Sequence, residues 1–149
     1  MNKKGLATRV AAAAITMSAA TTGTIAATST DASAAALGCA TFGTVNIGGH
    51  TIPGGLYCFG VYGSGLTITG TESSAQTAII YNESEIIRVY GGNGSLRSTV
   101  TTISRTGAKY GQQSWSTKYR PTIYNGGKIC GYLRSSGTVI ATVCHPTYK

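Results

Sequence analysis

The chain has 149 residues, of which 12 are Lys or Arg and only 4 are Asp or Glu, so its formal net charge is +8. One domain fits this length, and a hydrophobic content of 42% with 11% charged residues excludes a disordered chain. No run of about 18 apolar residues is present, which excludes a protein that crosses a membrane several times.

The N-terminal segment has the features of a secretion signal. Three basic residues precede a small-residue apolar stretch over 10–20, and residues 32–34 match an A-x-A cleavage pattern. We therefore predict a cleaved signal peptide over 1–34 and a single secreted β domain over 35–149, with no transmembrane segment in the mature chain. An N-terminal membrane anchor and a lipoprotein attached at Cys39 are the alternatives, but the stretch is short for an anchor.

The predicted mature chain separates its charges along the sequence. Its three acids, Glu72, Glu83 and Glu85, all precede residue 86, and its nine bases all follow residue 87, for a net charge of +6. The second half therefore has no carboxylate with which to form ion pairs, and its positive field must face solvent or an anionic partner.

The mature chain consists of short segments of period-two alternation separated by glycines, which predicts strands. The predicted strands are residues 44–47, 50–53, 56–62, 66–69, 77–82, 85–90, 95–104, 122–124, 128–134 and 138–145. Gly48-Gly49 predicts a tight hairpin turn, whereas 70–76 and 105–121 are expected to be polar loops. In 95–104 we place Leu96 and Val100 on one face, and Arg97 and Ile103 on the other. The expected fold is an all-β antiparallel sandwich or small barrel of about eight short strands.

Four cysteines, Cys39, Cys58, Cys130 and Cys144, remain after cleavage. They allow three pairings, and we favour Cys39–Cys58 and Cys130–Cys144 because each closes a short loop around a hairpin. A two-residue turn at Ser136-Gly137 would pair Cys130 with residue 143, so the second bridge requires a three-residue loop or a one-residue bulge. The spacings contain no C-x₂-C pair, so neither a metal site nor another cofactor is predicted.

Catalytic residues are scarce in this sequence. The only histidines are His50 and His145, and no G-x-S-x-G motif or mature Asp is present to complete a nucleophile triad. Glu83 and Glu85 are too close in sequence to flank a sugar bond, and we interpret them as solvated carboxylates. A secreted ribonuclease would need Glu85, Arg88 and His145 to converge in a cleft. We assign no catalytic residue, although an enzyme is not excluded.

The segment over 105–134 interleaves basic and aromatic residues, a composition that suits anionic polymers and protein-binding hot spots. The candidate binding residues are Arg105, Lys109, Tyr110, Trp115, Lys118, Tyr119 and Arg120. Their expected partner is an anionic polymer, either of the cell wall or a nucleic acid, or a protein target. The alternative is a solvated basic face that keeps the protein soluble.

Two parts of the chain, the GKICGYL segment at 127–133 with Cys144-His145 and the GSGLTI segment at 63–68, resemble small exported proteins of actinomycetes that have no assigned activity. The resemblance implies a bacterial secreted protein with paired cysteines. The sequence thus predicts a small extracellular binding protein, an inhibitor or toxin-like factor, that can associate with the cell wall. A small secreted hydrolase such as a ribonuclease, or a structural cell-surface protein, is the alternative.

Overall fold

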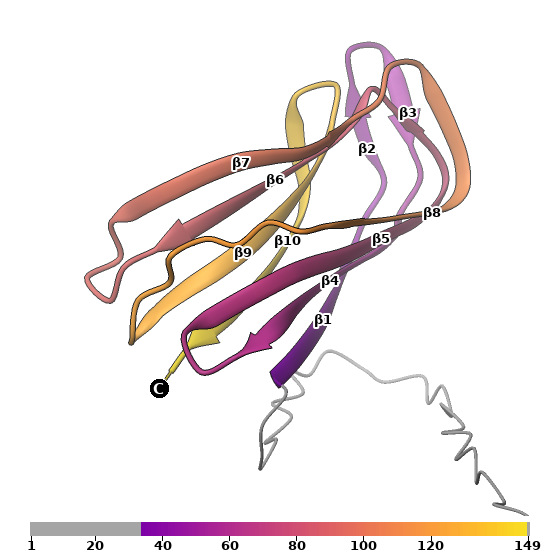
Figure 1. Ribbon diagram of the computed structural model, residues 1–149. Coiled ribbons are helices and arrows are strands. Elements are labelled where there is room, and N and C mark those ends of the chain that lie inside the picture. Colours follow the sequence, from indigo (N-terminus) through magenta and orange to yellow (C-terminus); the bar gives the residue numbers. More distant parts are fainter. Residues whose placement is uncertain (1–33, 149) are drawn as a thin grey trace, which may run out of the picture.

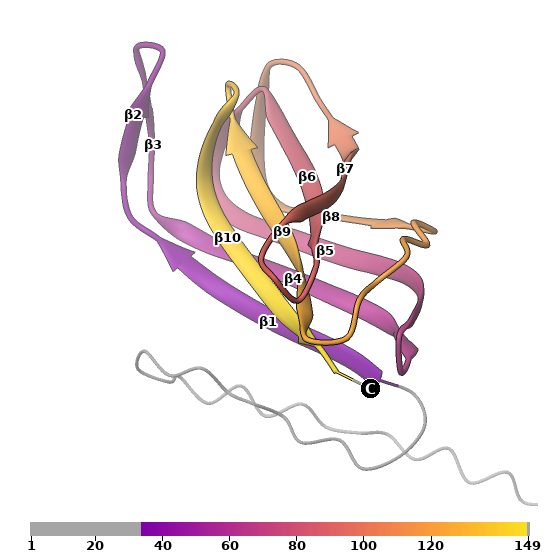
Figure 2. The same cartoon turned by 90° about the vertical axis from the view of Figure 1, so that its left-hand side faces the viewer.

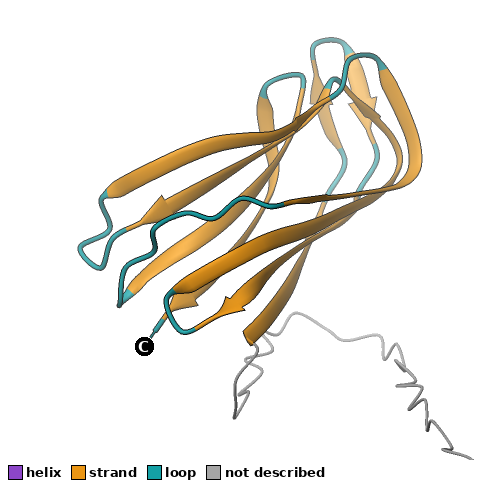
Figure 3. Cartoon of the chain, in the orientation of Figure 1, coloured by secondary structure: helices purple, strands orange, loops and turns teal. Residues whose placement is uncertain are grey.

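Two antiparallel four-stranded sheets face each other in the computed structural model, which describes residues 34–148 (Figure 1). The first sheet has the strand order β1-β4-β5-β8, and the second sheet has the order β10-β9-β6-β7. The described residues contain no helix (Figure 3). The predicted signal peptide and its cleavage lie outside the described residues, apart from Ala34.

The predicted all-β antiparallel fold is confirmed, with eight strands in the two sheets and two more in a hairpin. The first sheet contains β1 (Ala34–Phe42), β4 (Gly55–Ser64), β5 (Thr67–Tyr81) and β8 (Ala108–Thr117). The second sheet contains β6 (Glu83–Tyr90), β7 (Leu96–Ser104), β9 (Gly127–Ser135) and β10 (Thr138–Thr147). The hairpin consists of β2 (Val45–Ile47) and β3 (His50–Ile52), and it projects beyond the sandwich (Figure 2).

The hairpin has the turn that its paired glycines predict. Gly48 and Gly49 have φ values of 58° and 81°, which glycine adopts without the steric cost that a Cβ would bring. The His50 ring stacks on Tyr81 with a centroid separation of 4.0 Å, so the hairpin is packed against the end of β5.

Both predicted disulfides are present, and each joins directly opposed residues of two neighbouring strands. Cys39 pairs with Cys58 across β1 and β4, and Cys130 pairs with Cys144 across β9 and β10. The expected register problem at Ser136-Gly137 is solved by a bulge between residues 139 and 141 of β10. The extra residue moves Cys144 opposite Cys130, which the two-residue turn alone would not do.

Two segments predicted to be loops are strands. Residues 70–76 lie inside β5, and most of 105–121 forms β8. The inward residues of β5 are small, Ser73 and Ala75 among them, and they lie opposite the large Phe59 and Tyr57 of β4. Because these inward positions of β5 hold small residues, the alternation of apolar and polar residues along 70–76 is weak. The segment therefore looked like a polar loop in the sequence.

The predicted faces of β7 are also wrong. Bulges interrupt its pairing with β6 between Glu85 and Ile86 and again between Val89 and Tyr90. Each extra residue exchanges the inward and outward positions beyond it. Val100 and Ile103 therefore both pack against the core, while Leu96 is 53% exposed.

The core between the sheets contains the aromatic side chains of the first sheet and mostly aliphatic side chains of the second. Tyr57 and Phe59 are fully buried, and they lie against Gly131 of β9. A Cβ on Gly131 would lie 2.7 Å from the Phe59 ring and would overlap the Tyr57 hydroxyl. Glycine at this position is therefore needed for the close approach of the two sheets.

Candidate functional site

The two glutamates of β6 point into the sandwich, so the prediction that they are solvated is wrong. Residues two apart in a strand share a face, and for Glu83 and Glu85 that face is the interior, where both side chains are 0% exposed. Glu85 accepts hydrogen bonds from the Tyr57 hydroxyl, the Thr102 hydroxyl and Trp115 Nε1, the last at 2.8 Å. Glu85 is thus a structural acceptor for the core aromatics.

Glu83 is less well satisfied. Its Oε2 lies 3.4 Å from Arg105 Nη1, and its buried Oε1 has no hydrogen-bond partner among the described residues. Burial raises the pKa of Glu83, and the attraction of Arg105 offsets only part of this effect. Arg105 also donates to Gln113 at 3.0 Å and lies over the Trp115 ring at 5.6 Å from its centroid. Arg105 therefore belongs to an internal polar network.

The structure does not bring the predicted binding residues together on one surface. Trp115, which was expected to be the stacking residue, is only 9% exposed and packs in the core. Tyr119 also packs against the core, and its hydroxyl lies 2.7 Å from that of Ser98. Tyr110 is exposed and Lys109 is half-buried on β8. The remaining two, Lys118 and Arg120, are exposed in the segment between β8 and β9.

The side chains required for a ribonuclease do not converge. Glu85 is enclosed in the core, whereas Arg88, three residues along the same strand, lies on the opposite face of the sheet. His145 lies in the seam between β1 and β10, where its Nε2 is 2.8 Å from the Phe59 carbonyl oxygen. The structure therefore does not support the ribonuclease hypothesis, which required these three side chains to converge in one cleft.

A different group of basic and aromatic residues does assemble, on the outer face of the second sheet. Arg88, Tyr90, Lys128 and Tyr132 occupy outward positions of the adjacent strands β6 and β9, and we call them the basic cluster. The Arg88 guanidinium lies 5.2 Å from the Tyr132 ring centroid, and the Lys128 ammonium lies 5.2 Å from that of Tyr90. The cluster consists of two cation–π pairs.

The two tyrosines link the pairs into one unit. Their hydroxyl oxygens are 2.7 Å apart, across the position of Cys130, whose side chain is fully buried. Burial and the hydrogen bond with Tyr90 raise the pKa of Tyr132 to about 12, so its hydroxyl stays neutral. The charge of the cluster therefore comes from Arg88 and Lys128.

A third pair extends this basic surface. Arg97, the second residue of β7, lies 5.3 Å from the Tyr124 ring centroid, and the two residues lie next to turns at the Tyr90 end of β6. These turns touch, since a Cβ on Gly92 would lie 3.1 Å from the Asn125 carbonyl oxygen. The pair thus continues the cluster toward one end of the sandwich.

None of the carboxylate side chains of residues 34–148 lies on this face. Glu83 and Glu85 are enclosed between the sheets. Glu72 is exposed on the outer face of the first sheet, where it accepts a hydrogen bond from Tyr62. The cations of the cluster are therefore uncompensated, and their field is directed into solvent.

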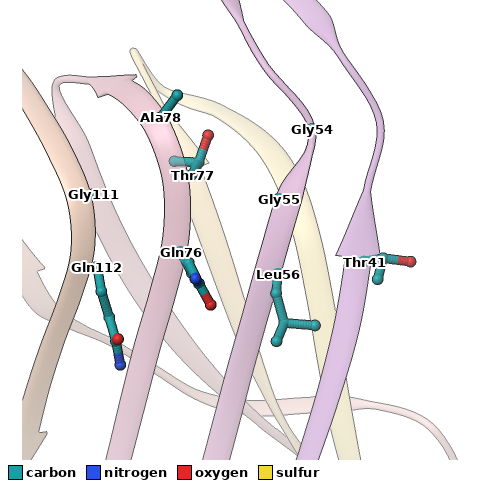
Figure 4. Close-up of a pocket in the computed structure, with 9 residues that line it drawn as sticks. All are labelled: Thr41, Gly54, Gly55, Leu56, Gln76, Thr77, Ala78, Gly111 and Gln112. Atoms are coloured by element: carbon teal, nitrogen blue, oxygen red, sulfur yellow. The ribbon is translucent and has the colours of Figure 1, made fainter. Parts of the chain in front are cut away.

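The outer face of the first sheet is chemically different. Thr41, Leu56, Gln76 and Gln112 form a row of paired residues across its four strands. They line a shallow groove together with glycines at residues 54, 55 and 111 (Figure 4). All of the side chains lining this groove are uncharged, so it has no group that would attract an anion.

No model of a known protein family matches the chain, and a search of curated proteins finds no match either. Within residues 34–148, none of the secondary structure is a helix of the length and apolarity needed to cross a membrane.

The basic cluster was missed because it depends on a pairing between distant strands. The alternating positions 88 and 90, and 128 and 132, each combine a cation with a tyrosine, and this local signal is visible in the sequence. The register of β6 with β9, which places Tyr90 opposite Lys128, is not. The predicted site was centred on 105–120 because that segment interleaves basic and aromatic residues.

Proposed function

We propose that this is a secreted, disulfide-stapled binding protein that holds an anionic polymer on the outer face of its second sheet. The observation that carries the proposal is the basic cluster itself: two cations held over tyrosine rings on a face without carboxylates. The site differs from the predicted one, since Trp115 and Arg105 contact the buried glutamates Glu85 and Glu83.

The chemistry of the cluster suits a chain of repeated negative charges. The guanidinium of Arg88 can donate two parallel hydrogen bonds to a phosphate or carboxylate group, and the Lys128 ammonium acts as a compact point charge. Because both cations are already ordered by the tyrosines, binding loses less side-chain entropy than it would at two free surface cations. Release of the polymer's counterions supplies the driving force.

The disulfides support this role by fixing the strands that carry the face. Cys130 lies between the two tyrosines and is bonded to Cys144 of the edge strand β10. Such crosslinks persist in an oxidising, extracellular compartment, where wall polymers and released nucleic acids are the polyanions at hand.

The proposal is tested by the salt dependence of binding to inorganic polyphosphate. The double variant Arg88→Gln/Lys128→Gln is compared with Lys118→Gln/Arg120→Gln, which removes the same charge from exposed positions elsewhere. If each lost contact changes the slope of log K against log salt by about 0.7, as for single-stranded nucleic acids, the first variant flattens it by about 1.4. The control variant should keep the wild-type slope.

Two results would contradict the proposal. Equal flattening in both double variants would mean that binding follows overall charge and uses no particular face. A shallow wild-type slope together with tight binding to a secreted protein would instead indicate a protein target with a buried hot spot.

A further inference from the structure

The tyrosines of the basic surface are arranged in a way that restricts which polyanion it binds. In each of the pairs Arg88–Tyr132, Lys128–Tyr90 and Arg97–Tyr124, a cation lies between 5.2 and 5.3 Å from the ring centroid. Stacking with a nucleic-acid base requires a free aromatic face. The cation occupies one face of each ring, so a base can stack there only by displacing the cation, and partial burial restricts the second face of Tyr90 and Tyr132.

The two rings at the centre are restricted further. Tyr90 and Tyr132 are half-buried, and their hydroxyls contact each other at 2.7 Å. A base that entered between them would have to separate this hydrogen bond and displace a cation from each ring. The two rings therefore hold the Arg88 and Lys128 cations in place and do not stack with aromatic ligands.

We infer, on the basis of the proposed function, that the ligand is a linear phosphodiester or polyphosphate chain whose repeat unit carries no aromatic ring. Such a chain satisfies Arg88 and Lys128 through its oxyanions alone. On this face a nucleic acid is bound only through its backbone, with no contribution from its bases. A membrane is disfavoured, since the exposed aliphatic side chains of this face, Leu96 opposite Tyr90 and Val139 opposite Arg134, lie on the two opposite edge strands and form no continuous apolar surface that could enter a bilayer.

The experiment compares two probes with the same backbone. One is a single-stranded oligodeoxythymidylate, and the other is an abasic deoxyribose-phosphate chain of equal length. We expect their dissociation constants to agree within about threefold, because stacking on even one tyrosine would strengthen thymidylate binding by about fivefold or more. Thymidylate binding that is tenfold tighter than abasic binding would overturn the inference and leave the proposed function standing.

Variants separate the two roles of the rings. Tyr90→Leu and Tyr132→Leu release a cation and should weaken both probes equally, by about two- to fivefold. Tyr90→Phe and Tyr132→Phe keep the cation–π pairs but lose the hydrogen bond between the hydroxyls, so they should weaken both probes equally and by less than the leucine variants do. A loss confined to the thymidylate probe would show that the rings stack and would overturn the inference.

Two further outcomes are informative. Vesicles containing phosphatidylglycerol that bind more tightly than the abasic chain, at equal phosphate concentration, would overturn the assignment to a polymer. If neither polymer binds at low salt, the proposed function fails, and the inference fails with it. Folding of every variant is checked by the cooperative loss of near-ultraviolet circular dichroism on heating.

Discussion

The two sheets share one plan but distribute their side chains in opposite ways. Each has four antiparallel strands and one disulfide between opposed residues on adjacent strands. The first sheet directs Tyr57, Phe59 and Trp115 inward and leaves a groove of neutral side chains outside. The second directs two glutamates inward and presents cations with tyrosines outside. The same scaffold thus supports a core aromatic layer on one sheet and a charged surface on the other.

The largest expected effect is on stability, and it should differ between an aromatic residue that points inward, Trp115, and one that points outward, Tyr132. Trp115→Ala should lower the free energy of unfolding by about 3–5 kcal/mol, because it opens a cavity and removes one of the three hydrogen-bond donors to buried Glu85. Tyr132→Ala should cost only about 1 kcal/mol but should weaken polyphosphate binding. Urea denaturation and binding titration measure both effects. If the folded Trp115→Ala protein loses affinity while Tyr132→Ala does not, the contrast between the sheets is wrong.

Removing the disulfides one at a time compares the sheets directly. The bridges span 19 and 14 residues, and each should contribute about 3 kcal/mol in the chain-entropy model. The variants Cys39→Ser/Cys58→Ser and Cys130→Ser/Cys144→Ser should therefore be destabilised to a similar extent. Only the second should also weaken polyanion binding, because Cys130 lies between the two tyrosines. An equal loss of affinity in both would argue against a site on the second sheet.

The contact between the sheets depends on a glycine. Gly131→Ala should cost about 1–3 kcal/mol, since the added methyl group overlaps Tyr57 and Phe59. Gly43→Ala is the matched control, because a Cβ there meets nothing within 4 Å. Thermal unfolding of both variants tests this. Similar melting temperatures would mean that the sheets separate easily at Gly131.

The smallest expected effect concerns pH. Burial raises the pKa of Glu83 above its ordinary value of 4.5, so the folded protein retains a proton that the unfolded chain releases first. The stability contributed by Glu83 is complete below the ordinary pKa and is lost as pH rises through the folded-state pKa. Unfolding free energy should therefore fall more steeply with pH in wild type than in Glu83→Gln. An equal pH dependence in the two proteins would contradict the burial of Glu83. Affinity for polyphosphate should not follow this titration, since Glu83 lies inside.

The features that could be predicted from the sequence are those that depend on neighbouring residues. Local signals were sufficient for the Gly48-Gly49 turn, for both disulfides and for the need of a bulge before Cys144. They failed where the meaning of a residue depends on a partner far along the chain. Trp115 looked like an exposed binding residue because its place opposite Ser73 could not be known. The same long-range pairing hid the basic cluster.

The separation of charge was visible in the sequence, but its meaning was not. Glu83 and Glu85 were interpreted as solvated because two carboxylates so close in sequence do not suit the two sides of a cleft, and because Glu83 falls between two predicted strands. Their partners, Tyr57 on β4 and Arg105 after β7, come from other strands. Only the fold reveals that these two acids are buried in the core, while the cations of the basic cluster lie on the outer face of the second sheet.

The most direct test of the central claim is a map of where a polyanion touches the protein. Backbone amide chemical shifts of the ¹⁵N-labelled protein are recorded during a titration with inorganic polyphosphate. We predict that the largest changes fall on β6 and β9, around Arg88, Tyr90, Lys128 and Tyr132, with little change along Thr41, Leu56, Gln76 and Gln112. Changes concentrated on the outer face of the first sheet, or on residues 118–120, would contradict it.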